Sequence, residues 1–165
     1  MFSEVLENVE NFNRSIIHNK HMAFRRFRGR TKLMYFPKKT AVAISRGRLL
    51  KFDNAGFVTG AVGDTGERLV GISRDSWATT DTGTDPIAVE VPIENAVEWE
   101  IDTDSDGGAT DTHVGSTRDL DTLGANVDVS ASTQKNILIT KRVSSTKVIG
   151  ILTRLVFNHG NLLTT

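Results

Sequence analysis

The sequence contains no cysteine in 165 residues, and it has only three prolines. The absence of cysteine excludes a disulfide framework and thiol chemistry, so packing or association between chains has to hold the fold. No apolar run approaches the length of about eighteen residues that a membrane-spanning helix needs. The N-terminus is acidic and has no clean apolar stretch, so we expect no secretory signal peptide. The length suits one domain with a sizeable core.

Motifs of common catalytic sites are also missing: there is no G-x-S-x-G elbow, no P-loop and no dinucleotide fingerprint. The glycine-rich run at residues 60–66 joins two strand-like segments, so it has no helix dipole with which to bind a phosphate. Four histidines, His18, His21, His113 and His159, show no paired metal-ligand spacing. We therefore expect a protein that is not an enzyme, with no catalytic residue and no cofactor.

Charge is unevenly distributed although the formal net charge is zero. Residues 1–50 carry a net charge of +8, residues 51–130 carry −13, and residues 131–165 carry +5. A basic head, an acidic middle and a basic end favour charge-matched contacts with another surface or between copies of the same chain. Nothing in this pattern indicates a membrane partner.

The first twenty residues have the only clear helical pattern in the sequence. Apolar residues recur with a helical period at Phe2, Val5, Leu6, Val9, Phe12 and Ile16. Ser3 suits the N-cap, and Glu4 and Glu7 suit the positive end of the helix dipole. An isolated helix of about sixteen residues is marginal in water, so this apolar stripe should need a partner surface.

A basic aromatic segment follows at residues 21–30. The residues that we expect to make its contacts are Phe24, Arg25, Arg26, Phe27, Arg28 and Arg30. One interpretation is a nucleic-acid contact, with arginines on phosphates and phenylalanines on bases. The other, which we favour because only this arm is basic, is an extended arm that lies on an acidic protein surface with both phenylalanines as anchors. We therefore divide the chain into an N-terminal arm, residues 1–30, and a β-domain, residues 31–165.

From residue 31 onward the pattern changes to short β-prone runs separated by turn residues. The clearest runs lie at residues 40–53, 55–75, 86–102, 126–132, 136–143 and 146–157. Within the third run, alternation places Ile87, Val89, Val91 and Ile93 on one face, and Ala88 and Glu90 on the other. Short strands at this spacing predict an all-β domain, either a small barrel or a sandwich.

An acidic stretch, DTDSDGGATDTH at residues 102–113, resembles the first half of a calcium loop. In the EF-hand pattern its ligands at positions one, three and five would be Asp102, Asp104 and Asp106. Position twelve, which needs a bidentate carboxylate, is His113. The three aspartates are therefore weak metal candidates at most.

We expect this stretch to form an exposed turn after the strand that contains Trp99. Gly107 and Gly108 would supply the positive φ angles that such a reversal requires. The turn would then hold a loosely bound cation or face basic residues of a neighbouring subunit.

The runs AVAISRGRLLKFDNAGFVTGAVGDTGERLVGISRD and PIAVEVPIENAVEWEID resemble the capsid decoration (cement) proteins of tailed bacteriophages. The likeness lies in a G-x-L-L step, an L-V-G-I-S strand and a V-E-V-P run, and it extends over residues 40–157 through HVGSTRDL, NVDVSAS and TKVIGIL. It implies a β-barrel or β-tulip-like fold, a homotrimer and a seat on the outer capsid surface, in contact with the major capsid protein.

On this basis we expect a virion protein, made in the host cytoplasm, that cements neighbouring capsid subunits. The arm residues named above would bind the capsid. Two alternatives remain open: a β-barrel that binds single-stranded nucleic acid, and another structural component of the phage head or tail. The acidic middle and the single tyrosine speak against the first.

Overall fold

The computed structural model describes residues 24–61, 68–80, 82–94, 96–104, 107–121 and 125–156. The regular structure of these residues is β throughout, apart from one 3-10 turn at Asp111–His113. The all-β prediction is therefore confirmed. The helix predicted over the first twenty residues lies outside the described residues. Within the described part of the chain, no helix has the length and apolar character to span a membrane.

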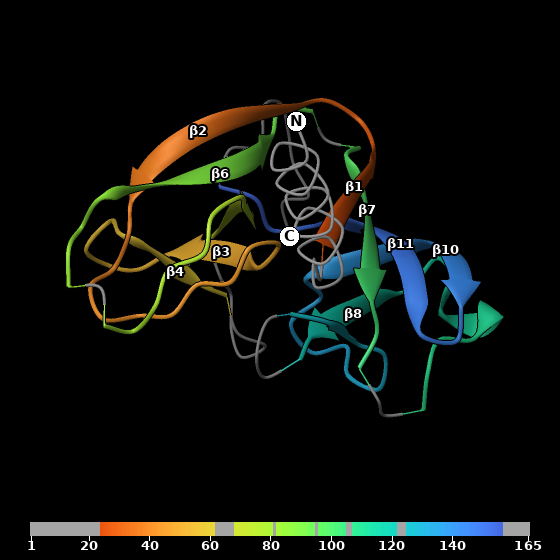
Figure 1. Ribbon diagram of the computed structural model, residues 1–165. Helices are drawn as coiled ribbons and strands as arrows, with labels where there is room; N and C mark the ends of the chain where they lie inside the picture. The colour runs from red at the N-terminus through yellow and green to blue at the C-terminus, as the bar shows by residue number, and fades with distance from the viewer. Residues whose placement is uncertain are drawn as a thin grey trace, which may run out of the picture.

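Two antiparallel sheets make up the fold (Figure 1). In spatial order, the first consists of β1 (Phe24–Arg28), β7 (Glu98–Asp102), β11 (Lys147–Leu152), β10 (Ile137–Ser144), β8 (Thr117–Leu120) and β9 (Val127–Asp128). The second consists of β2 (Thr31–Pro37), β6 (Pro86–Pro92), β5 (Leu69–Ser73), β3 (Leu49–Phe52) and β4 (Val58–Gly60). Neither sheet closes on itself or on the other, so the described strands form open sheets rather than a closed barrel.

The chain passes between the sheets at two crossings that lie side by side. One crossing joins β1 to β2 through Gly29, and the other joins β6 to β7. Ile93 N–H donates to the carbonyl of Arg30 at 3.1 Å, which ties the two crossings together. Gly29 has φ +101°, and a Cβ there would lie 2.8 Å from the Cα of Val97. Because β1 pairs with β7 and β2 with β6, one bent two-stranded ribbon is shared by both sheets.

The main core lies against the inner face of the six-stranded sheet. Its buried residues include Phe24, Leu49, Leu69, Ile72, Trp99, Ile101, Ile137, Ile139 and Val148. A second core covers the other face of the five-stranded sheet: Ile44, Leu50, Val58, Val70, Ile87, Val89 and Val91. The sheet is therefore buried on both faces at β5, where all five residues are buried.

The alternation predicted for residues 86–93 is confirmed at the residues that belong to the second core. Ile87, Val89 and Val91 share the second core, while Glu90 points to the opposite face and contacts Arg74. The run at residues 40–46 does not become a regular strand. Only Ile44 makes a bridge, with backbone hydrogen bonds to Trp77 of 3.0 and 2.7 Å.

Candidate functional site

The arm residues predicted from the sequence divide into two groups. Phe2, Val5, Leu6, Val9, Phe12 and Ile16 lie outside the described residues. Phe24 to Arg28 form β1, an edge strand that is hydrogen-bonded to β7. Phe24 is fully buried in the main core, whereas Phe27 is 54% exposed. The described part of the basic segment is thus a strand of the sheet: its Phe24 side chain is buried in the core, and the other side chains of β1 are exposed at the sheet edge.

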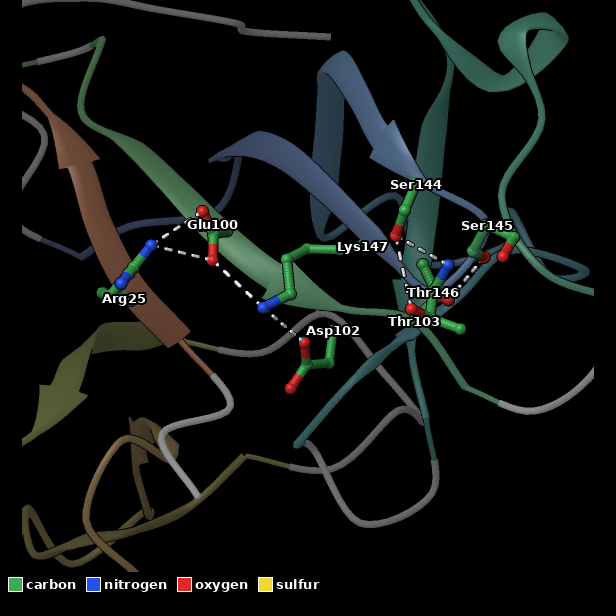
Figure 2. A network of polar contacts seen from close by, with 8 residues as sticks. All are labelled: Arg25, Glu100, Asp102, Thr103, Ser144, Ser145, Thr146 and Lys147. Atoms are coloured by element: carbon green, nitrogen blue, oxygen red, sulfur yellow. Dashed lines mark hydrogen bonds and ion pairs between the residues drawn. The ribbon is translucent and has the colours of Figure 1, made fainter. Parts of the chain in front are cut away.

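A charged face runs across β1, β7 and β11 on the solvent side of the six-stranded sheet. We define it by Arg25, Arg28, Glu98, Glu100, Asp102 and Lys147. Figure 2 shows its centre, where the Glu100 carboxylate lies between the guanidinium of Arg25 and the ammonium of Lys147. Arg25 Nη2 donates to both Glu100 oxygens at 3.1 and 3.0 Å. Lys147 Nζ lies 3.1 Å from Glu100 Oε1 and 3.5 Å from Asp102 Oδ1.

The other end of the charged face is anchored by Glu98. Its Oε2 lies 3.3 Å from Nε of Arg28, and its Oε1 accepts a hydrogen bond from Thr140 Oγ1 at 2.9 Å. The Glu98 and Glu100 side chains are largely covered, each 15% exposed, while Arg25 and Arg28 remain exposed. The acidic strand is therefore neutralised by basic residues of the same chain.

These contacts shift two pKa values in opposite directions. Burial raises the pKa of Glu100, but hydrogen bonds from Lys147 and Arg25 outweigh this effect and hold the pKa below its ordinary value. The hydrogen bond to Glu100 raises the pKa of Lys147 above its ordinary value, against the opposing effect of burial. Both shifts favour the charged forms of Glu100 and Lys147 at neutral pH, which suits electrostatic contact rather than proton transfer.

Arg26 takes a different direction and links the two sheets. Its Nη1 donates to Thr31 Oγ1 at 2.6 Å and lies 3.4 Å from Glu90 Oε1 on β6. Thr31 Oγ1 in turn donates to the same Glu90 oxygen at 2.6 Å, and Arg74 contacts the other. Glu90 is almost completely buried, so two guanidiniums and a hydroxyl compensate its desolvation. This cluster fixes the corner of the shared ribbon.

The acidic stretch at residues 102–113, here called the acidic loop, begins on the charged face. Asp102 faces Lys147, the Asp104 N–H donates to the Val127 carbonyl at 3.0 Å, and Asp106 lies outside the described residues. Gly107 and Gly108 have φ angles of +90° and +67°, which confirms the predicted glycine-dependent reversal. Across the described ranges, no group of three acidic or histidine side chains is positioned to hold a metal ion.

The hairpin that connects β10 to β11 holds this loop in place. Figure 2 shows Thr103 against the hairpin residues Ser145 and Thr146. Thr103 N–H donates to the Thr146 carbonyl at 3.0 Å, and Thr103 Oγ1 donates to the Ser145 carbonyl at 3.2 Å. The Ala109 N–H donates to the same Ser145 carbonyl at 2.6 Å. Thr103 and Ala109, on either side of the two glycines, are therefore attached to one hairpin.

The sequence reasoning missed one structural carboxylate, that of Asp119. It is buried and accepts backbone hydrogen bonds from Thr133, Gln134 and Lys135 at 2.9, 2.7 and 2.7 Å. Successive N–H groups that converge on one anion form a nest, and here the chain supplies its own anion. The clustered serine and threonine residues before Lys135 were a turn signal, but no local pattern identified the distant carboxylate that organises the turn.

It also missed two exposed apolar side chains on β2. Leu33 is 49% exposed and Tyr35 is 65% exposed, and they lie on the same face of the strand. Among the described strands, β2 lies at the edge of its sheet and pairs only with β6. The alternation from residue 31 to residue 37 could have indicated the strand, but the sequence could not show which face remains open.

The chain matches no protein-family model and no curated protein. The family suggested by the sequence therefore remains a resemblance.

Proposed function

We propose that this protein is a structural component of a tailed-phage virion that binds the outer capsid surface and cements neighbouring major capsid protein subunits. The sequence resemblance over residues 40–157 suggests the class. The observation that carries the proposal is the placement of β1: the strand that ends the arm is basic, exposed and at the edge of its sheet, and the sequence before it carries the apolar period of residues 2–16. A β-tulip-like arrangement and a homotrimer are part of this proposal.

The geometry supports a clamp in which the folded domain and the arm have separate tasks. Phe24 fixes the base of the arm in the core, while Phe27 remains available at the surface. The apolar stripe of residues 2–16 then supplies area for a docking surface on a neighbouring subunit. Ordering such a segment costs conformational entropy, which the apolar contacts with the capsid would have to exceed.

The pairing of the arginines bears on the nucleic-acid alternative. Arg25 and Arg28 are each engaged by a carboxylate of β7, and Arg26 is engaged by Glu90. A phosphate backbone would have to displace these intramolecular partners, which lowers the gain from each contact. We therefore favour a protein surface as the ligand. A filter-binding assay with single-stranded DNA and RNA checks this choice.

The test compares two chains on capsids that lack this protein. The first is the full-length chain, and the second is a deletion of residues 1–22, which retains all of β1. We expect the deletion variant to keep its all-β circular dichroism spectrum and to lose at least tenfold in capsid affinity. Equal occupancy of both chains would exclude the arm as the anchor, and failure of the full-length chain to bind capsids would contradict the function. A cryo-EM map of the decorated particle would locate the chain on the lattice.

A further inference from the structure

The outer edge of β2 carries backbone groups that no described strand of the protein pairs with. Arg30 lies opposite Ile93, and its carbonyl accepts the Ile93 N–H. Because hydrogen-bonded and non-hydrogen-bonded pairs alternate, the backbone N–H and carbonyl groups of the even-numbered residues in β2 point towards β6. Ala88, which lies opposite Tyr35, makes its backbone hydrogen bonds on the side away from β2: its N–H donates to the Asp75 carboxylate, and its carbonyl accepts the Arg74 N–H. The N–H and carbonyl groups of Thr31, Leu33 and Tyr35 therefore point away from the sheet.

The same residues form an apolar strip. Leu33 and Tyr35 are the exposed apolar side chains of β2, and both belong to the outward-pointing set. Exposed apolar edge strands are unusual in soluble proteins because they recruit another strand. The strip ends at defined points: Gly29 turns the chain into β1, and Pro37 has no N–H to donate.

We propose that β2 pairs with β2 of a second copy of this chain, antiparallel and across a two-fold axis at Leu33. The outward-pointing set has three members and is centred on Leu33, so a two-fold rotation places Leu33 opposite itself and Thr31 opposite Tyr35 of the other copy. Each of these pairs exchanges both of its N–H···O bonds. The second sheet then continues across the two chains, and Leu33 and Tyr35 of both copies cover one another.

The neighbouring registers are less favourable, which selects this one. A shift in one direction places Lys32 opposite Lys32 of the second copy, a like-charge pair. A shift in the other direction places Pro37 opposite Thr31, and that pair makes only one of its two N–H···O bonds because proline has no N–H. In the proposed register Lys32 lies opposite Met34, whose thioether adapts to the lysine stem.

This contact differs from the charge-matched association suggested by the charge blocks. It consists of backbone hydrogen bonds and apolar side chains, and basic residues such as Arg30 and Lys32 approach from both copies. Salt should therefore leave the association unchanged or strengthen it, because screening reduces the repulsion. The inference does not depend on the proposed function. An isologous contact gives dimers, or pairs of trimers if trimers also form through another surface.

Because the chain has no cysteine, single substitutions can test the register directly. Residues directly opposite each other in a hydrogen-bonded pair have Cα atoms about 5.5 Å apart, which is within the range of a disulfide. The purified Leu33→Cys protein should form a disulfide-linked dimer under mild oxidation. Tyr35→Cys alone should not, but an equimolar mixture of Thr31→Cys and Tyr35→Cys proteins should form the heterodimer. Val143→Cys, at an equally exposed position on β10, is the matched control.

Sedimentation equilibrium of the native sequence and of two lysine variants completes the test. We expect an even-numbered assembly at low and high salt, at least tenfold weaker in Leu33→Lys and in Tyr35→Lys, and unchanged in Val143→Lys. Thermal unfolding establishes that each variant is folded. A monomer at all concentrations, a trimer as the only assembly, or an assembly that both lysine variants leave intact would overturn the proposal. Equal cross-linking at positions 33 and 143 would also overturn it.

Discussion

Arg25 and Glu100 lie directly opposite one another on β1 and β7, and one guanidinium nitrogen donates to both carboxylate oxygens. The two residues are 75 positions apart in the chain. Arg25 belongs to the basic head and Glu100 to the acidic middle, so this pair shows how part of the uneven charge distribution is balanced within one molecule. The first strand is held at the sheet edge by this pair, by Arg28 with Glu98, and by the burial of Phe24.

Glu100→Gln should lower the free energy of unfolding by about 1 kcal/mol at neutral pH, because Arg25 and Lys147 are partly solvated. The native pKa of Glu100 is depressed, so its stabilisation is present above about pH 4–5 and is lost as pH falls through the native pKa. The variant should therefore show a shallower loss of stability on acidification. Urea denaturation at a series of pH values measures both effects, with Asp102→Asn as a milder control.

The dependence of the stability on pH in the alkaline range provides an independent check on the contact between Lys147 and Glu100. The native pKa of Lys147 is raised, so its contribution is present at neutral pH and is lost as pH rises through the native pKa, above about pH 10. Lys147→Met should flatten this alkaline decline. An alkaline decline identical to that of the native sequence would show that the Lys147–Glu100 contact contributes no stability.

Glu90→Gln should be more destabilising, by about 2 kcal/mol, because Glu90 is almost completely buried and its charge holds two guanidiniums, which are themselves partly exposed. Arg74 and Arg26 would both lose their carboxylate, at the point where the shared ribbon bends between the sheets. Glu94→Gln is the matched control, because Glu94 accepts only the Arg30 N–H among the described contacts and is partly exposed. Equal losses in the two variants would contradict a special role for the buried cluster.

Gly71→Ala should destabilise the protein by about 2 kcal/mol or more. Gly71 is the glycine of the L-V-G-I-S run, and a Cβ at this position would collide with the backbone carbonyl oxygen of Glu90. Gly83→Ala is the control: its Cβ would approach the Asp85 carboxylate at 3.1 Å, and that side chain can move. Thermal unfolding of both variants compares the costs, and equal midpoints would mean that the β5–β6 spacing relaxes freely.

Calcium titration should give no tight, saturable binding near one ion per chain. Asp102 already faces Lys147, and His113 stands where an EF-hand needs its bidentate carboxylate. Isothermal calorimetry of chelator-treated protein, beside a variant with Asp102, Asp104 and Asp106 changed to asparagine, measures this directly. Tight binding that the variant loses would establish a calcium site. Weak heat that disappears at moderate salt would fit a solvated acidic loop.

Local patterns in the sequence were sufficient for the class of fold and for several details. Alternation at Ile87, Val89 and Val91 identified the buried face of β6, because a strand has a fixed period of two. Paired glycines predicted the reversal at residues 107–108, because few other residues adopt positive φ. These features depend on the backbone and on immediate neighbours, which a linear sequence records.

Only the tertiary structure decided how the strands divide into two open sheets, and which charges meet. The sequence around Arg25 does not predict its contact with Glu100, and the sequence around Thr133 does not predict its contact with Asp119. Each pair forms between segments that the sheet topology brings together. The exposed edge of β2 has the same origin. Its pattern could be recognised along the chain, but its openness depends on where the second sheet ends, and that is fixed by the two crossings at Gly29 and Ile93 rather than by β2 itself.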